Sequence, residues 1–270
     1  MRLLFCGDVM GRSGRDAILT HVPKLRESLK LDVVAVCGEN AAHGFGITAA
    51  ICKEFFAAGV DAITLGNHAW DQREIIEYIA TEPRLIRPLN FPSGTPGQGL
   101  SVVRTASGQR VMIAQVICRL FMESVDDPFR AIDRCLTEHP LGRGMSAIIV
   151  DIHGEATSEK GAIGCVADGR ASLAVGSHAH IPTADARILP GGTAFQTDAG
   201  MCGDFDSVIG MKKELAIHRF TSRVPGPRLE PATGEGTLCG VYVETNDATG
   251  LATRVEPVRV GGHLKASVPG

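Results

Sequence analysis

The stretch DAITLGNHAWD, residues 61–71, joins an apolar run to two neighbouring polar side chains, Asn67 and His68. The apolar run predicts a short buried strand, and the glycine after it marks the end of that strand. Taken alone, the polar pair is equally typical of a surface turn, because Asn tolerates left-handed backbone. Two earlier apolar runs end in the same way, LLFCGD at 3–8 and VVAVCGEN at 33–40. Three predicted strands therefore end in a glycine that is followed at once by a polar residue.

Helical segments separate these three strands. Apolar periodicity predicts helices at 15–30 and 48–58. Strands and helices in alternation indicate parallel strands joined by right-handed crossovers. In open α/β sheets, ligands bind outside the carboxyl ends of the parallel strands. We therefore expect Asp8, Glu39 and Asn67 to lie at one crevice.

The rest of the chain adds antiparallel pairs and two strands that end in histidine. Antiparallel hairpins are expected at 101–117, at 186–198 and around the turn 247–250. A helix is expected at 128–138, and the strands at 146–154 and 172–180 carry histidines at their ends. These elements predict a mixed α/β fold. Because no long linker interrupts them, we expect one domain over residues 1–270.

Composition and charge exclude several classes of protein. The 270 residues include 27 basic and 30 acidic side chains, a net charge of -3, so we expect no extended cationic surface for duplex nucleic acid. No segment approaches the ~20 apolar residues that span a bilayer, so we expect a soluble, cytoplasmic protein without a membrane partner. The eight cysteines are scattered and form no CxxC pair. This favours reduced thiols over disulfides or a structural zinc site.

Side chains with metal-binding chemistry collect at the predicted strand ends. A lone histidine in such a place is usually a hydrogen-bonded core or loop residue, but four histidines together with carboxylates and amides indicate a metal site. In GSHAHIP at 176–182, two histidines stand two residues apart, so we expect an extended segment to present both on one face. The candidate residues are Asp8, Glu39, Asn40, Asn67, His68, His153, His178 and His180.

These residues lie in blocks that resemble the calcineurin-like metallophosphoesterases, and within them the YmdB-type bacterial phosphodiesterases. The blocks are GDVMGRSGR at 7–15, CGENAAHGFGIT at 37–48, TLGNHAWD at 64–71, DIHGEATSEK at 151–160, VGSHAHIPTAD at 175–185 and QTDAGMCGD at 196–204. The resemblance implies a four-layer α/β/β/α fold, in which two mixed β-sheets pack as a sandwich flanked by helices.

One position departs from the wider superfamily. The usual Asp-x-His opening is Asp8-Val9-Met10 here, and the usual bridging Asp is Glu39. A thioether is a poor ligand for a hard or borderline cation, so Met10 does not replace the missing imidazole. The resemblance to the YmdB-type subgroup implies that Asn40 takes that place.

The resemblance implies two metal ions that share Glu39. It assigns one ion to Asp8, Glu39, Asn40 and His180, and the other to Glu39, Asn67, His153 and His178. Iron or manganese is favoured, and zinc is also compatible with oxygen and imidazole ligands. A hydroxide bridging the ions would attack phosphorus, and His68 would act as the general acid that protonates the leaving alkoxide.

The implied activity is hydrolysis of small phosphodiesters, such as the cyclic nucleotide 2',3'-cAMP. Two alternatives stay open: a phosphomonoesterase or nucleotidase, and a metal-bound regulatory or RNA-associated protein with little turnover. RNA is a candidate partner because it carries the same diester as a cyclic nucleotide. The sequence also leaves open whether the chain forms a homo-oligomer.

Other polar residues in these blocks have two interpretations each. His43 lies in a glycine-containing loop, where it either contacts substrate or is solvated. Asp151, Asp198 and Asp204 either orient metal-bound imidazoles or serve in turns and caps. The glycines of residues 11–15 match no nucleotide-binding motif, and we expect them to shape a strand-to-helix turn.

Overall fold

The computed structural model describes residues 1–270 and contains two six-stranded mixed sheets. The first sheet has, in spatial order, β14 (Ala252–Val260), β13 (Leu238–Thr245), β1 (Arg2–Cys6), β3 (Val33–Cys37), β4 (Ala62–Thr64) and β5 (Leu85–Ile86). Strands β1, β3, β4 and β5 are parallel, and β13 runs antiparallel to both β1 and β14. The parallel arrangement of the first three strands is therefore confirmed.

The second sheet is parallel in its centre and antiparallel at both edges. It has, in spatial order, β10 (Arg187–Ile188), β11 (Ala194–Gln196), β9 (Leu173–Ser177), β8 (Ala147–His153), β7 (Arg110–Ile117) and β6 (Leu100–Arg104). Strands β7, β8, β9 and β11 are parallel, whereas β6 and β10 form the expected hairpins with β7 and β11. A separate short pair joins β2 (Asp8–Val9) to β12 (Met201–Cys202).

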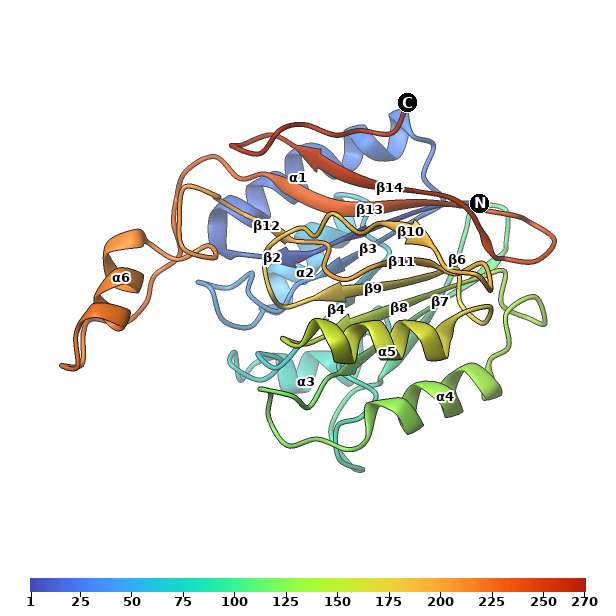
Figure 1. Cartoon of the computed structure of the whole chain (residues 1–270), viewed down its shortest axis with the longest axis horizontal. Helices are drawn as coiled ribbons and strands as arrows, with labels where there is room; N and C mark the ends of the chain where they lie inside the picture. Colours follow the sequence, from blue (N-terminus) through green and yellow to red (C-terminus); the bar gives the residue numbers. More distant parts are fainter.

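Helices cover the outer faces of both sheets, which gives four layers (Figure 1). The first sheet carries α1 (Gly11–Ser28), α2 (Ala49–Ala57) and α3 (Ile75–Ile79), and the second carries α4 (Pro128–Glu138) and α5 (Thr157–Ala167). The strand period of two explains the layering, because Leu4 of β1 packs toward the helices while Leu3 and Phe5 pack between the sheets. The predicted sandwich of two mixed sheets flanked by helices is confirmed.

Local signals in the sequence position several helices. Thr48 caps α2, since its side-chain oxygen accepts a hydrogen bond from the backbone N–H of Ile51 at 3.3 Å. Asp127 caps α4 by accepting from the N–H groups of Phe129 and Arg130, and Pro128 occupies the first turn. Both helices begin and end within a residue of the predicted bounds.

The start of α1 differs from the prediction. The helix begins at Gly11 rather than at residue 15, so the glycines belong to its first turn instead of a preceding loop. A Cβ atom on Gly14 would lie 2.2 Å from the carbonyl oxygen of Cys202, so glycine allows the helix to pack directly on β12. The helices α3 and α5 were also absent from the sequence-based assignment.

A further helix, α6 (Lys213–Thr221), extends away from the body of the molecule (Figure 1). Only Ala216 of its nine residues is buried. None of the helices has the length and apolar character that a membrane span requires. Seven of the eight cysteines are buried, and none is paired with another.

Candidate metal centre

The carboxyl ends of strands from both sheets meet at one place and deliver the predicted residues there. Asp8 follows β1, while Glu39 and Asn40 follow β3. From the second sheet, His153 is the last residue of β8 and His178 follows β9 directly. The crevice expected at the strand ends is therefore formed by both sheets together.

Glu39 lies at the middle of the cluster and is almost fully buried. Its Oε1 atom accepts a hydrogen bond from Asn40 Nδ2 at 3.0 Å and lies 3.3 Å from His153 Nε2. Its Oε2 atom accepts from the backbone N–H of His68 at 3.2 Å. Asn40 Nδ2 also lies 3.2 Å from His180 Nε2. One carboxylate thus contacts residues from three separate segments.

His153 also contacts Asn67 and His178. His153 Nε2 is 3.0 Å from Asn67 Oδ1 and 3.2 Å from His178 Nδ1. Three sets of residues each place their potential ligand atoms within 4.8 Å of one another: Asp8, Glu39 and His180; Glu39, His153 and His178; and Asp8, Cys37 and His153. Glu39 belongs to the first two sets, which together hold all the carboxylate and imidazole ligands that were predicted. The structure therefore brings all seven predicted ligands together, in two groups around a common carboxylate.

The space between these atoms fits cations. A Cβ atom placed on Gly66 would lie 2.1 Å from Glu39 Oε2 and 2.2 Å from His153 Nε2, so glycine keeps this space clear of side-chain carbon. The surrounding donors are carboxylate oxygens, amide oxygens and imidazole nitrogens, which suit first-row divalent ions. The residues present fit a metal centre.

The electrostatics of the cluster favour positive charge at its centre. Burial alone would lower the pKa of His153, but the carboxylates of Glu39 and Asp8 outweigh it and raise this pKa to about 9. Burial and the charge of His153 lower the pKa of His178 to about 3. Burial raises the pKa of Asp8 above its usual value. A cation between these groups would take the place of the proton that His153 otherwise holds.

The backbone at His178 and His180 differs from the extended segment that we predicted. Both residues have positive φ, 93° and 65°, so their side chains do not leave one face of a strand. Distant side chains impose this conformation. Asp8 Oδ2 accepts from the N–H of His178 at 2.9 Å, and Asp198 Oδ2 accepts from the N–H of Ala179 at 3.0 Å.

A buried ion pair supports the same loop. Lys160 Nζ lies 2.7 Å from Asp198 Oδ2, and both side chains are almost completely buried. Asp198 Oδ1 also accepts from the N–H of Gly200. Asp198 therefore orients the loop backbone rather than an imidazole. Lys160 was not singled out from the sequence, because its partner lies 38 residues away.

Asp151 reaches the cluster through a serine. The Oγ atom of Ser177 donates to Asp151 Oδ1 at 2.6 Å and lies 2.8 Å from His153 Nδ1. A hydroxyl has one proton, so when Ser177 gives it to Asp151 it can only accept from His153 Nδ1. The proton of neutral His153 then sits on Nδ1, and Nε2 presents its lone pair to the cluster.

The imidazole of His68 is hydrogen-bonded to Asp71 and to none of the seven clustered residues. Its Nδ1 atom lies 2.8 Å from Asp71 Oδ2, and 29% of the side chain is exposed. Asp71 was not predicted, although a carboxylate three residues after a histidine in a turn is a readable signal. The pair leaves Nε2 of His68 free to exchange a proton with a ligand.

Three other predicted positions have structural roles. Met10 packs with Met201 and Met211 in a small buried cluster, which agrees with its exclusion as a ligand. Asp204 accepts from the N–H groups of Asp206 and Gly234, so it stabilises turns. Cys37, one of the cysteines predicted to be reduced, donates its thiol to Asp8 Oδ1 at 3.5 Å. Burial raises the pKa of this thiol well above its usual value.

Comparisons with known proteins agree with this geometry. Residues 4–258 match the family model described as YmdB-like protein. The chain is 45% identical over 260 residues, 96% of its own length and 97% of the other, to the 2',3'-cyclic-nucleotide 2'-phosphodiesterase of Bacillus subtilis (strain 168).

Two crystal structures are similar along nearly the whole chain. One is a hypothetical protein from Thermus thermophilus, at 40% identity and a TM-score of 0.90, covering 97% of this chain and 100% of the other. The second is a phosphatase from Mycoplasma pneumoniae, at 32% identity and a TM-score of 0.88, covering 97% and 93%.

Proposed function

The chain belongs to the YmdB-like protein family, and from that premise we propose that it hydrolyses the phosphodiester of 2',3'-cyclic nucleotides. As in its relatives, the activity is that of a hydrolase acting on phosphate esters. The observation that carries the proposal is the sharing of Glu39 between two groups of ligand atoms, since phosphodiester hydrolysis is well served by two neighbouring cations.

We propose the ligand assignment that the sequence predicts. One ion is held by Asp8, Glu39, Asn40 and His180, and the other by Glu39, Asn67, His153 and His178. Iron or manganese is the favoured metal, with zinc as the alternative. When bound, the ions supply the positive charge that binds phosphoryl oxygens and activates a water molecule for attack.

His68 supplies the proton for the leaving group, and Asp71 orients the His68 ring. Hydroxide attacks the phosphorus atom, and the bond between phosphorus and O2' breaks, as the name of the Bacillus relative implies. The departing O2' takes a proton from Nε2 of His68, while Asp71 holds the opposite ring nitrogen. The reaction consumes one water molecule, and its product is a nucleoside 3'-phosphate.

A comparison of substrates tests the proposal. Full-length protein loaded with Mn²⁺ is expected to convert 2',3'-cAMP to 3'-AMP, and to hydrolyse bis-p-nitrophenyl phosphate far faster than p-nitrophenyl phosphate. A preference for the monoester would instead favour a phosphomonoesterase. Metal analysis of protein purified without added ions is expected to find two equivalents per chain. Binding of both metals without turnover of any diester would favour a regulatory protein.

A further inference from the structure

The ring of Phe45 contacts His68 and also lies close to the guanidinium of Arg228. The rings of Phe45 and His68 meet edge to face at a centroid distance of 5.2 Å, and the Arg228 guanidinium lies 5.6 Å from the same Phe45 centroid. Gln72 Nε2 donates to the carbonyl oxygen of Phe45 at 2.8 Å, which fixes the loop beside His68. A ligand that extends past His68 therefore meets Phe45 and then Arg228.

Two hollows continue from this point. Their volumes are about 590 and 560 Å³, and both are bordered by Phe45, Arg228 and Leu229. The first also has Arg15 of α1 on its wall, and the second reaches the surface around α6. Ligand pockets span roughly 300–1,000 Å³, so each hollow can hold a unit of nucleotide size. Together they form a path that starts at Phe45, beside His68, and ends at the α6 arm, which comprises α6 and the loop after it, residues 213–229.

Four of the six basic side chains that line these hollows have no carboxylate partner. No ion pair within 4.0 Å involves Arg15, Arg219, Arg223 or Arg228, and the buried Nε of Arg15 has no hydrogen-bond partner. Lys212 and Arg12 differ, because Lys212 pairs with Glu230 at 2.6 Å and Arg12 pairs with Asp16 at 3.6 Å. In a chain of net charge -3, unpaired arginines gathered on one path point to an anionic ligand.

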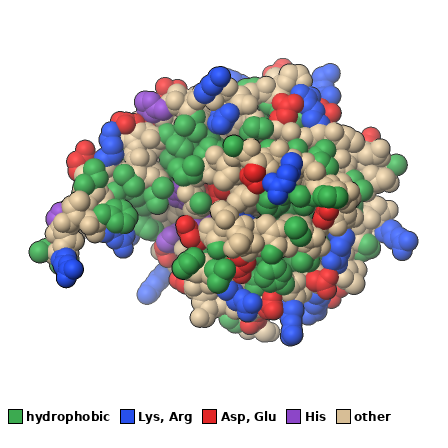
Figure 2. Space-filling view, in the orientation of Figure 1, with side chains coloured by type: hydrophobic (Ala, Val, Ile, Leu, Met, Phe, Trp, Pro, Cys, Tyr) green, Lys and Arg blue, Asp and Glu red, His purple; other side chains and the backbone are tan.

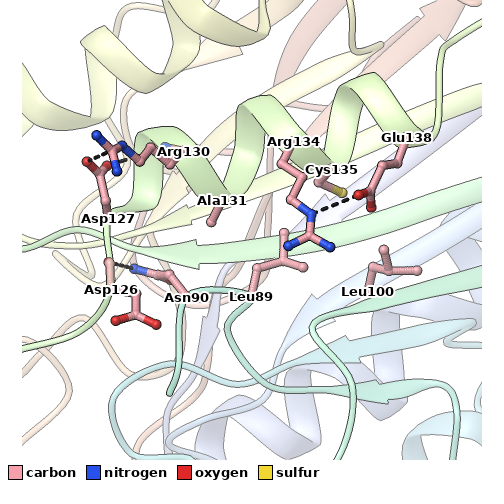
Figure 3. A pocket seen from close by; sticks show the side chains of 10 residues that line it. All are labelled: Leu89, Asn90, Leu100, Asp126, Asp127, Arg130, Ala131, Arg134, Cys135 and Glu138. Carbon is pink, nitrogen blue, oxygen red and sulfur yellow. Dashed lines mark hydrogen bonds and ion pairs between the residues drawn. The ribbon is translucent and has the colours of Figure 1, made fainter. Parts of the chain in front are cut away.

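In another hollow of similar volume, the arginines that line it have carboxylate partners. A cavity of about 540 Å³ lies beside α4 (Figure 3). Its arginines are paired locally, Arg134 with Glu138 at 2.7 Å and Arg130 with Asp127 at 3.9 Å. That hollow therefore offers no free cation, in contrast to the hollows beside Phe45.

The arm also exposes apolar and aromatic side chains among its arginines. Phe220 is 83% exposed and Val224 is 71% exposed, and Figure 2 shows basic and hydrophobic side chains intermingled on the arm. Arginines that contact phosphates, combined with aromatic rings that stack on bases, bind single-stranded nucleic acid without sequence preference. A cyclic mononucleotide has only one phosphate, which reacts at the metal centre. It would leave these arginines without partners.

We propose that the path from Phe45 to α6 binds the nucleotides that precede a terminal 2',3'-cyclic phosphate, so that the enzyme acts on the 3' ends of single-stranded oligoribonucleotides. This inference rests on the proposed function. The cyclic phosphate reacts at the metal centre, and the preceding phosphates contact Arg228, Arg223 and Arg219. The reaction is the same: water adds to phosphorus, the P–O2' bond breaks, and O2' receives the proton.

The test compares two substrates with the same terminal adenosine 2',3'-cyclic phosphate, the mononucleotide and a pentaribonucleotide. For Mn²⁺-loaded full-length protein, kcat/KM is expected to be at least about tenfold higher for the pentamer at low salt, mainly through KM, and this advantage should fall as salt rises. In the triple variant R219Q/R223Q/R228Q the advantage should shrink to about twofold or less. Arg130→Gln removes an exposed arginine outside the path and should retain the advantage.

A binding measurement separates this inference from the proposed function. Fluorescence anisotropy of a labelled pentamer with a 3'-phosphate requires no turnover, and it should report salt-dependent binding that the triple variant loses. Equal kcat/KM for both substrates, or an undiminished advantage in the triple variant, would overturn the inference while leaving cyclic-nucleotide hydrolysis intact. Salt-dependent binding that the triple variant loses, without hydrolysis of either substrate, would overturn the proposed function and with it the action on 3' ends, and would leave only the binding role of the path.

Discussion

The metal centre and the arginine path lie one aromatic ring apart, yet they are built in opposite ways. The centre draws its residues from strand ends, and Asp8, Glu39 and His153 are completely buried there. The path is formed by loops, by Arg12 and Arg15 of α1, and by α6, of which one residue is buried. Burial fixes the centre through dense hydrogen bonding, whereas Arg219, Arg223 and Arg228 are exposed and have no ion pair. We infer that the buried cluster carries out the chemistry and that the exposed path binds the ligand, and each of these roles can be tested separately.

The largest loss of activity is expected from a substitution at Glu39, which is completely buried. Glu39→Gln removes the charge shared by the two groups of ligand atoms, so both metals should be lost, and kcat/KM for 2',3'-cAMP should fall by at least about 10³-fold. Metal content per chain and hydrolysis rates measure the two effects. Glu77→Gln, an exposed glutamate on α3, is the matched control and should change neither. Two retained metals in the Glu39 variant would contradict the central place given to this carboxylate.

The next effect concerns stability and is expected at the buried ion pair of Lys160 and Asp198, which supports the loop that carries His178 and His180. Lys160→Met leaves the carboxylate of Asp198 buried without its cation, and breaking such a pair costs about 3–5 kcal/mol of unfolding free energy. Urea denaturation measures this loss. The double variant K160M/D198N removes both charges and should recover part of it. If Lys160→Met costs less than about 1 kcal/mol, the pair does not hold the loop.

His68 lies at the border between the two regions and should show an intermediate effect. His68→Ala removes the proposed proton donor but none of the seven clustered residues, so kcat should fall by roughly 10²–10³-fold while metal content stays unchanged. A nitrophenyl diester has a good leaving group that needs little protonation, so its hydrolysis should fall much less. Equal losses for both substrates would show that His68 has another role.

The same contrast explains what the sequence could reveal. Asp8, Glu39 and Asn67 were predictable because parallel strands place their carboxyl ends at one edge, and that topology follows from apolar periodicity. The backbone conformation of His178 and His180 was not predictable. Their positive φ depends on hydrogen bonds from this loop to Asp8 and Asp198, which lie elsewhere in the sequence.

The helices that were missed have a related cause. The sequence of α6, KELAIHRFT, has no apolar stripe, because the helix packs against almost nothing. The sequence of α5 contains two glycines and a buried Lys160, features that argue against a buried helix until the partner Asp198 is known. The ring of Phe45 beside His68 likewise depends on a loop contact without a periodic signal.

The smallest effect is expected from a residue that acts on the centre through another. Ser177→Ala removes the hydroxyl that links Asp151 to His153 Nδ1, so the imidazole loses the partner that fixes its tautomer. Changes of this kind weaken metal binding by about 10–100-fold, because the ligand is still present but less well oriented. Titration with Mn²⁺ measures the affinity, and excess metal should restore most of the activity. Ser101→Ala removes another buried hydroxyl, from β6, and should leave the affinity unchanged. Should Ser177→Ala bind metal as tightly as the unchanged protein, orientation by hydrogen bonding is not what prepares the centre, and the packing of His153 alone must suffice.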